Sequence, residues 1–167
     1  MNYDKKLKIS FVILAIIFFI IGLVMSEPNN TNVSQLSYVS IPIIFLVNLF
    51  TVFICVLIAP SGLSIIIIFK IIFTIGYTSN SIFLPIYIYL PISLIHGIFE
   101  IICLYISYKI TISHWKNYFS DIDDKFNVFR GLLYKTFTKY LPVIVSLLII
   151  GSVLEVLISN KLAIYFS

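Results

Sequence analysis

The sequence predicts an all-α protein: a polytopic membrane helix bundle of about five transmembrane helices plus a cytoplasmic interfacial amphipathic helix. The first reason is composition, because the chain of 167 residues is 60% hydrophobic and only 11% charged, with a mean hydropathy of +1.11. The second is that its apolar residues form uncharged runs near the length that crosses a bilayer, about 20 residues. The third is that lysine and arginine cluster between only some of these runs.

The apolar runs define a single integral membrane domain over residues 1–167. The expected spans lie at about 9–25, 39–59, 61–78, 83–108 and 141–159. Pro60-Ser61-Gly62 separates the second span from the third, and Ser79-Asn80-Ser81 separates the third from the fourth. Both are turn sequences, and the spans leave no room for a separate soluble domain.

The basic residues indicate orientation, because loops rich in lysine and arginine stay in the cytoplasm. Lys5, Lys6 and Lys8 precede the first span, and residues 26–38 contain no basic residue. Most of the others lie between the fourth and fifth spans: Lys109, Lys116, Lys125, Arg130, Lys135 and Lys139. We therefore expect a cytoplasmic N-terminus and an external C-terminus. Because topology explains the net charge of +4, nucleic acid is not an expected partner.

The amphipathic helix is expected within this basic region, after the acidic run Asp121-Ile122-Asp123-Asp124. Acidic residues suit the N-terminus of a helix. Phe126, Phe129, Leu133 and Phe137 then share one face, opposite Lys125, Arg130 and Lys135. We expect this helix to lie on the inner leaflet. A calcium-binding EF-hand loop is excluded, because its glycine and final glutamate positions hold Phe126 and Leu132.

Four of the spans carry polar residues at spacings of three and four, which place side chains on one helix face. The stripes are Asn48, Thr51 and Cys55; Lys70, Thr74 and Thr78; Ser93, His96, Glu100, Cys103 and Ser107; and Ser152, Glu155 and Ser159. We expect them to converge on a buried polar core of Asn48, Lys70, Ser93, His96, Gly97, Glu100, Ser152 and Glu155. Gly97 would let another helix come close, whereas the first span is expected at the periphery.

Depth along the spans suggests which ionisable residues meet, since a helix rises about 1.5 Å per residue. Lys70 and Glu100 lie at similar depths, so we expect them to pair. His96 and Glu155 are expected to approach each other on the external side of that pair. Each charge at mid-membrane costs roughly 2.5 to 3.5 kcal/mol on insertion scales, and pairing would explain how these residues are tolerated.

Three segments resemble a known family. LIHGIFEII, residues 94–102, resembles the histidine-glycine-x-x-glutamate (HGxxE) signature of the stage II sporulation protein M family of bacterial membrane proteins. FLVNLFTVFI before it resembles the family's asparagine-bearing second span, and GSVLEVLIS after it resembles the glutamate-bearing last span. The resemblance runs from about residue 42 to 159. This chain departs from the family at Leu49, which replaces a second asparagine, at Thr74-Ile75-Gly76, and at Lys70, which has no counterpart.

The resemblance implies a non-catalytic scaffold or accessory component of the bacterial cytoplasmic membrane. The sporulation member helps to organise peptidoglycan-remodelling proteins, and relatives in circular-bacteriocin gene clusters are associated with maturation or immunity. The implied partners are therefore the lipid bilayer and other membrane proteins, namely peptidoglycan-remodelling proteins or a bacteriocin transporter. A hydrophobic peptide and a second copy of the chain are further expected partners.

Catalysis is the alternative function. His96 and Glu100 share a helix face at the spacing of the two histidines in HExxH, and Glu155 would be the third ligand of a transition metal such as zinc. Water on that metal, or His96 and Glu100 acting as acid and base, could hydrolyse a peptide bond. No HExxH motif is present, and the cofactor is otherwise unknown. Proton transport is a third function open to buried Lys, Glu and His residues, although no internal repeat supports it.

Overall fold

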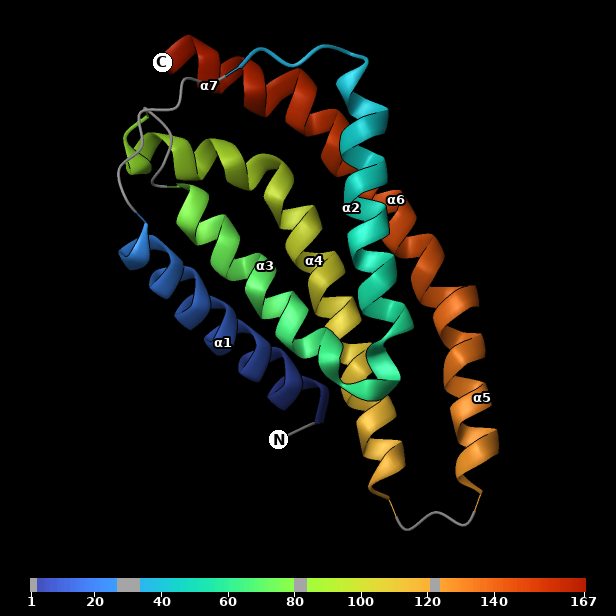
Figure 1. The fold of residues 1–167 in the computed structure, drawn as a ribbon. Helices are drawn as coiled ribbons and strands as arrows, with labels where there is room; N and C mark the ends of the chain where they lie inside the picture. The colour runs from blue at the N-terminus through green and yellow to red at the C-terminus, as the bar shows by residue number, and fades with distance from the viewer. Residues whose placement is uncertain (1–2, 27–33, 80–83, 121–123) are drawn as a thin grey trace.

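The chain folds into a bundle of helices, shown in Figure 1. This computed structural model describes residues 3–26, 34–79, 84–120 and 124–167. Nearly all of these residues are helical, and none of them forms a strand. The predicted all-α fold class is therefore confirmed.

The elements follow the predicted spans closely at the start of the chain and diverge toward its end. In order they are α1 (Tyr3–Met25), α2 (Ser40–Leu57), the 3-10 turn η1 (Ala59–Ser61), α3 (Leu63–Ser79), α4 (Ile86–Tyr118), α5 (Lys125–Lys135), the π-helix η2 (Thr136–Tyr140), α6 (Leu141–Leu154), the π-helix η3 (Glu155–Ser159) and α7 (Asn160–Phe166). The predicted turn at 60–62 forms η1, which Gly62 ends with a positive φ of 76°. Glycine adopts this left-handed conformation without steric cost.

Four helical segments in the described residues are long and apolar enough to cross a membrane: Asp4–Met25, Ser40–Leu57, Ile86–Tyr118 and Lys125–Phe166. The remaining apolar helix, α3, is shorter at 17 residues. At about 1.5 Å per residue, the 33 residues of α4 exceed the thickness of a bilayer core, about 30 Å. These lengths are consistent with a membrane protein.

The C-terminal half differs from the sequence prediction in the position of the amphipathic helix. This helix forms as α5, and Asp124 caps it by accepting a hydrogen bond from the Asn127 backbone N–H at 3.2 Å. However, α5 is not a separate element, because the helical run continues through η2 into α6. Figure 1 shows α5 in line with α6 and beside the lower end of α4. His114 of α4 packs its ring against Phe129 of α5, 5.3 Å between centroids, so α5 belongs to the bundle instead of standing apart.

Helix α1 packs tightly on α3 at the edge of the bundle (Figure 1). Gly22 of α1 lies against the backbone of Phe73, and Gly76 of α3 lies against the backbone of Phe19. A side chain at either glycine would collide with the facing helix backbone. This reciprocal arrangement is the small-residue contact by which apolar helices approach closely inside a membrane.

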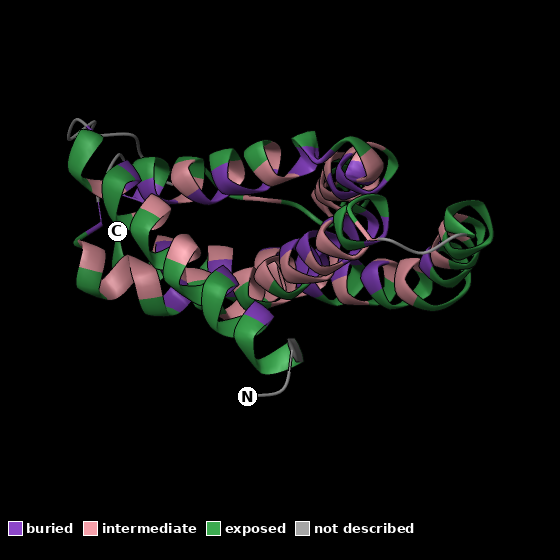
Figure 2. Cartoon of the chain, turned by 90° about the horizontal axis from the view of Figure 1, so that it is seen from below, coloured by how far each residue is buried: buried purple, intermediate pink, exposed green. Residues whose placement is uncertain are grey.

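Helix α4 is the centre of the bundle, because two apolar cores form on different sides of it. One core joins α4 to α1 and α3 through residues that include Phe11, Phe69 and Tyr108. The other joins α4 to α2 and α6 through residues that include Cys103, Ile144 and Leu148. In Figure 2 the buried residues follow the inward sides of the helices and the exposed residues follow the outward sides. Residues on α4 are therefore well placed to link the other helices.

Candidate functional site

The HGxxE glutamate is held by the asparagine of the second span. Asn48 Nδ2 on α2 donates a hydrogen bond to Glu100 Oε1 on α4 at 2.5 Å. Both residues are half-buried. The contact joins two of the three segments on which the family resemblance depends, and it fastens α2 to α4.

The HGxxE histidine is held by a serine of η3. His96 Nδ1 lies 2.9 Å from Ser159 Oγ, a hydrogen bond in which either atom can be the donor. Ser159 is buried, and it ends the π-helical segment that starts at Glu155. A π-turn is wider than an α-turn and changes which side chains face a neighbouring helix. His96 therefore bonds to Ser159, one turn beyond Glu155, while His96 and Glu155 border the same cavity.

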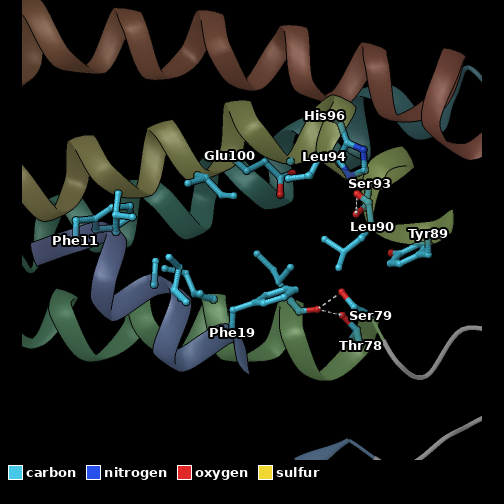
Figure 3. A pocket seen from close by; sticks show the side chains of 17 residues that line it. Phe11, Phe19, Thr78, Ser79, Tyr89, Leu90, Ser93, Leu94, His96 and Glu100 are labelled. Atoms are coloured by element: carbon cyan, nitrogen blue, oxygen red, sulfur yellow. Dashed lines mark hydrogen bonds between the residues drawn. The ribbon is translucent and has the colours of Figure 1, made fainter. Parts of the chain in front are cut away.

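Two cavities adjoin these hydrogen bonds. The α1–α3–α4 cavity, of about 430 Å³, is bordered on the α4 side by Ser93, His96, Gly97 and Glu100. Figure 3 shows Glu100, Ser93 and His96 along that wall, across from Phe11 and Phe19 of α1. The α4–α7 cavity, of about 260 Å³, lies beside η3 and α7 and is bordered by Ser93, His96, Glu155 and Ser159. His96 thus lies between the two spaces.

Three other residues of the predicted polar core, Ser93, Ser152 and Gly97, do not contact one another through hydrogen bonds in the structure. Ser93 is half-buried and donates to the carbonyl of Leu90 at 3.1 Å, while the buried Ser152 donates to the carbonyl of Ile149 at 3.0 Å. Both hydroxyls therefore bond within their own helices and do not link helices. Gly97 was expected to admit another helix, but a Cβ atom there would have no neighbour within 4 Å. It lines the α1–α3–α4 cavity instead.

Lys70 corrects the prediction most clearly. It is exposed on the outer side of α3, and its ammonium has no partner among the described residues, so the expected pair with Glu100 does not form. Ile68, Phe69 and Ile72 occupy the buried face of α3, together with Gly76. Because the packing against α1 and α4 uses that face, the stripe that contains Lys70 and Thr74 points away from the bundle.

The proposed metal ligands do not form a metal centre. No group of three or more His, Cys, Asp or Glu side chains in the described part of the chain is placed to hold a metal ion. His96, Glu100 and Glu155 are therefore not brought together as a three-ligand set. The hydrogen bonds of Glu100 and His96 to different helices account for this, because each side chain is drawn toward its own partner.

A third interhelical hydrogen bond was missed from the sequence. Ser64 Oγ on α3 lies 2.6 Å from Thr111 Oγ1 on α4, and both side chains are fully buried. Thr111 follows Ser107 by four residues and so continues the predicted stripe of α4. It was overlooked because the predicted span ended before Lys109, a charge that the structure pairs with Asp4 at 2.9 Å. Continuing the period of three and four would have found it.

Comparisons of the chain with known protein families, with curated proteins and with solved structures find no match. The resemblance to the stage II sporulation protein M family therefore stays a prediction from the three segments.

The hydrogen bond from Asn48 to Glu100 generates a stability prediction. Asn48→Leu removes the donor and leaves a half-buried carboxyl group without its partner, which costs about 1–3 kcal/mol of unfolding free energy. Glu100→Gln keeps an oxygen that can accept the same bond, so we expect a smaller loss. Thermal unfolding of the purified protein in detergent would measure both, with the exposed Lys70→Met as a control. Equal stability of wild type and Asn48→Leu would contradict a structural role for this bond.

Proposed function

We propose that this chain is a multi-pass membrane protein that works as a non-catalytic scaffold or accessory component by assembling with another membrane protein. The observation that carries this proposal is the position of Lys70. We infer that Lys70 pairs with an aspartate or glutamate on a transmembrane helix of the partner protein.

The face of α3 that carries Lys70 is apolar apart from this stripe. Ile66, one turn before Lys70, has 67% of its surface exposed, and Leu63 has 57%. Thr74, one turn after it, bonds its hydroxyl to the Lys70 carbonyl at 2.9 Å and needs no further partner. Lys70 is thus a cation without a described partner on a face otherwise suited to lipid.

A cation on that face costs free energy if lipid alone surrounds it, roughly 2.5–3.5 kcal/mol on insertion scales. Lysine can reduce this cost by extending its ammonium toward the headgroups. A carboxylate on a neighbouring helix reduces the cost and also makes that neighbour specific, because ionisable residues inside membranes pair with one another. Leucine at position 70 would have avoided the cost altogether, so a partner explains why the lysine is present.

Cross-linking at this face tests the proposal. We expect the photoreactive amino acid benzoylphenylalanine at Thr74 to give a discrete adduct in cells, whose cross-linked peptide contains Asp or Glu by mass spectrometry. Lys70→Met should lower the adduct roughly tenfold, the loss expected for about 1.4 kcal/mol of pairing energy. Benzoylphenylalanine at Val47, on an exposed position of α2, and Lys161→Met, an exposed lysine of α7, are the controls. An adduct that forms equally well in Lys70→Met would contradict the proposal.

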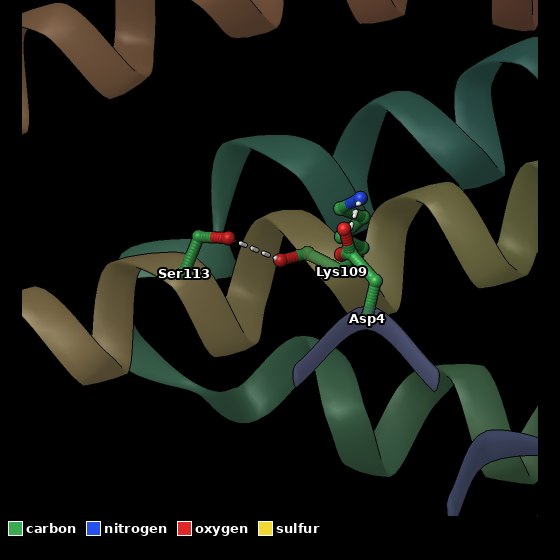
Figure 4. Close-up of polar contacts among 3 residues, drawn as sticks. All are labelled: Asp4, Lys109 and Ser113. Atoms are coloured by element: carbon green, nitrogen blue, oxygen red, sulfur yellow. Dashed lines mark hydrogen bonds and ion pairs between the residues drawn. The ribbon is translucent and has the colours of Figure 1, made fainter. Parts of the chain in front are cut away.

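The proposed location is a bacterial cytoplasmic membrane, with the N-terminus inside and the C-terminus outside. Figure 1 supports this orientation, since the start of α1, the α2–α3 turn and the end of α4 lie at one end, and the ends of α3 and α7 lie at the other. Most of the basic residues lie on the start of α1, the end of α4 and α5, whereas Lys70 is on α3 and Lys161 is on α7. Lys109 and Asp4 form their ion pair near that end (Figure 4). The positive-inside rule would place this end in the cytoplasm.

Cysteine labelling tests the orientation. A cysteine at Ser34 should react with an impermeant maleimide added to intact cells, whereas one at Arg130 should react only after permeabilisation. Both positions are exposed, while native Cys55 and Cys103 are fully buried and should contribute little background. The reverse pattern of labelling would show that the orientation is inverted.

The family resemblance supplies the biological setting of the proposal: cell-envelope remodelling, or maturation, export or immunity of a circular bacteriocin. The contact between Asn48 and Glu100 brings two of the resembling segments together in space. In either setting the partner at Lys70 would be another integral membrane protein.

Hydrolysis remains the second candidate function, favoured by the geometry of His96 and Ser159 at the α4–α7 cavity. The 2.9 Å contact would let Ser159 Oγ attack a peptide carbonyl carbon while its proton passes to His96 Nδ1. The proton would then pass to the departing amine, and water would hydrolyse the ester that joins the acyl group to Ser159. Glu155, in the same cavity, could stabilise the charged imidazole.

An activity-based probe separates this candidate from the scaffold. If Ser159 is a nucleophile, a fluorophosphonate should label the wild type, and Ser159→Ala should remove the labelling. Ser152→Ala, in the same long helix but hydrogen-bonded only within it, should stay labelled as the matched control. Absence of labelling in the wild type would exclude serine chemistry and leave His96–Ser159 as a structural link.

A further inference from the structure

The α1–α3–α4 cavity has walls of two kinds. Every α1 residue on it is apolar, and they include Phe11, Ala15 and Phe19. The α4 wall instead places Ser93, His96 and Glu100 along the same space (Figure 3). Its volume of about 430 Å³ falls within the range of small-molecule sites, roughly 300–1,000 Å³. A space of this kind suits a ligand that has an apolar chain and a polar group.

Glu100 determines which polar group fits. One of its oxygens accepts from Asn48, and no lysine, arginine or histidine among the described residues forms an ion pair with it. Lys70, the cation expected to pair with it, lies on the outer side of α3. A carboxylate beside an apolar space costs free energy unless a cation or several hydrogen bonds compensate it. No cation of the described residues therefore compensates Glu100, and a positively charged ligand could do so.

We propose that the α1–α3–α4 cavity binds a single-chain amphiphile with a primary amine, its ammonium against Glu100 and its alkyl chain against α1. The ammonium has three donors, enough for the oxygen of Glu100 that does not bind Asn48. The alkyl chain would bury apolar surface against Ala15 and Phe19. This site is separate from the outer face of α3, so it can exist with or without the partner at Lys70.

Gly97 offers a way to close the cavity without disturbing the fold. Its position has no atom within 4 Å of an added Cβ, so a leucine side chain there would project into the space. Gly131 on α5 is equally open and lies far along the chain, so Gly131→Leu matches the change in helix propensity without filling the cavity. Gly76, in contrast, lies against the α1 backbone and cannot serve as a control.

The test uses the full chain in phosphatidylcholine nanodiscs with a dodecylamine that carries a photoreactive diazirine on its chain. We expect labelling of residues that line the cavity, and we expect unlabelled dodecylamine to compete for it. Gly97→Leu and Glu100→Gln should each lower this labelling at least about tenfold, because one fills the space and the other removes the charge. Gly131→Leu should label as the wild type does, and a dodecanol probe with the same diazirine should label at least about tenfold less.

Other results would overturn the proposal. Equal labelling by the amine and alcohol probes would mean that a neutral lipid chain fills the cavity and that Glu100 selects nothing. Labelling unchanged by Gly97→Leu would place the amine outside the cavity. Thermal unfolding of each variant shows whether it is folded, and if Gly97→Leu fails to fold, Glu100→Gln decides, since its amide oxygen can still accept from Asn48.

Discussion

A polar side chain inside hydrocarbon has no water to bond, so its hydrogen bonds must come from the protein. In this chain α4 carries such side chains along much of its length, and each of three bonds reaches a different neighbour. The pairs are Asn48–Glu100 to α2, Thr111–Ser64 to α3 and His96–Ser159 to η3. Van der Waals packing also drives the association of helices inside a membrane, and the hydrogen bonds add direction to it. These directional bonds add to the two apolar cores around α4 and link it to α2, α3 and η3.

Small residues determine how closely the remaining helices approach, and the glycines show that their effect depends on position. Gly22 and Gly76 bring α1 and α3 into backbone contact. Gly97 sits beside the polar residues of α4, where the facing helices keep their distance and a cavity remains. Glycine therefore allows close helix contact between α1 and α3, whereas at Gly97 it borders a cavity. That space lies beside the HGxxE segment, which connects the packing of α1 and α3 to the candidate site.

The fold class was predictable because it depends on length and composition, which one sequence contains. The pairing of polar residues was not, because it depends on how each helix is rotated. The face of α3 with Ile68, Phe69 and Ile72 is buried, so Lys70 faces outward. The sequence alone did not show which of the two faces would be buried. His96 bonds to Ser159, which shares the predicted stripe with Glu155, and which of these two residues would be the hydrogen-bond partner depended on the rotation of that helix. The position of Asn48 opposite Glu100 likewise required the fold.

Lys70 and Glu100 would have neutralised each other if the bundle had brought them together. Instead the structure keeps them on different sides of α3, with Lys70 outside and Glu100 at the edge of a cavity. A chain selected only for stability would carry leucine at position 70, since an uncompensated charge opposes folding in a membrane. Departures from the most stable sequence are expected at functional positions. For each charge we propose a partner outside the chain: a carboxylate on a neighbouring protein for Lys70, and an amine within the cavity for Glu100.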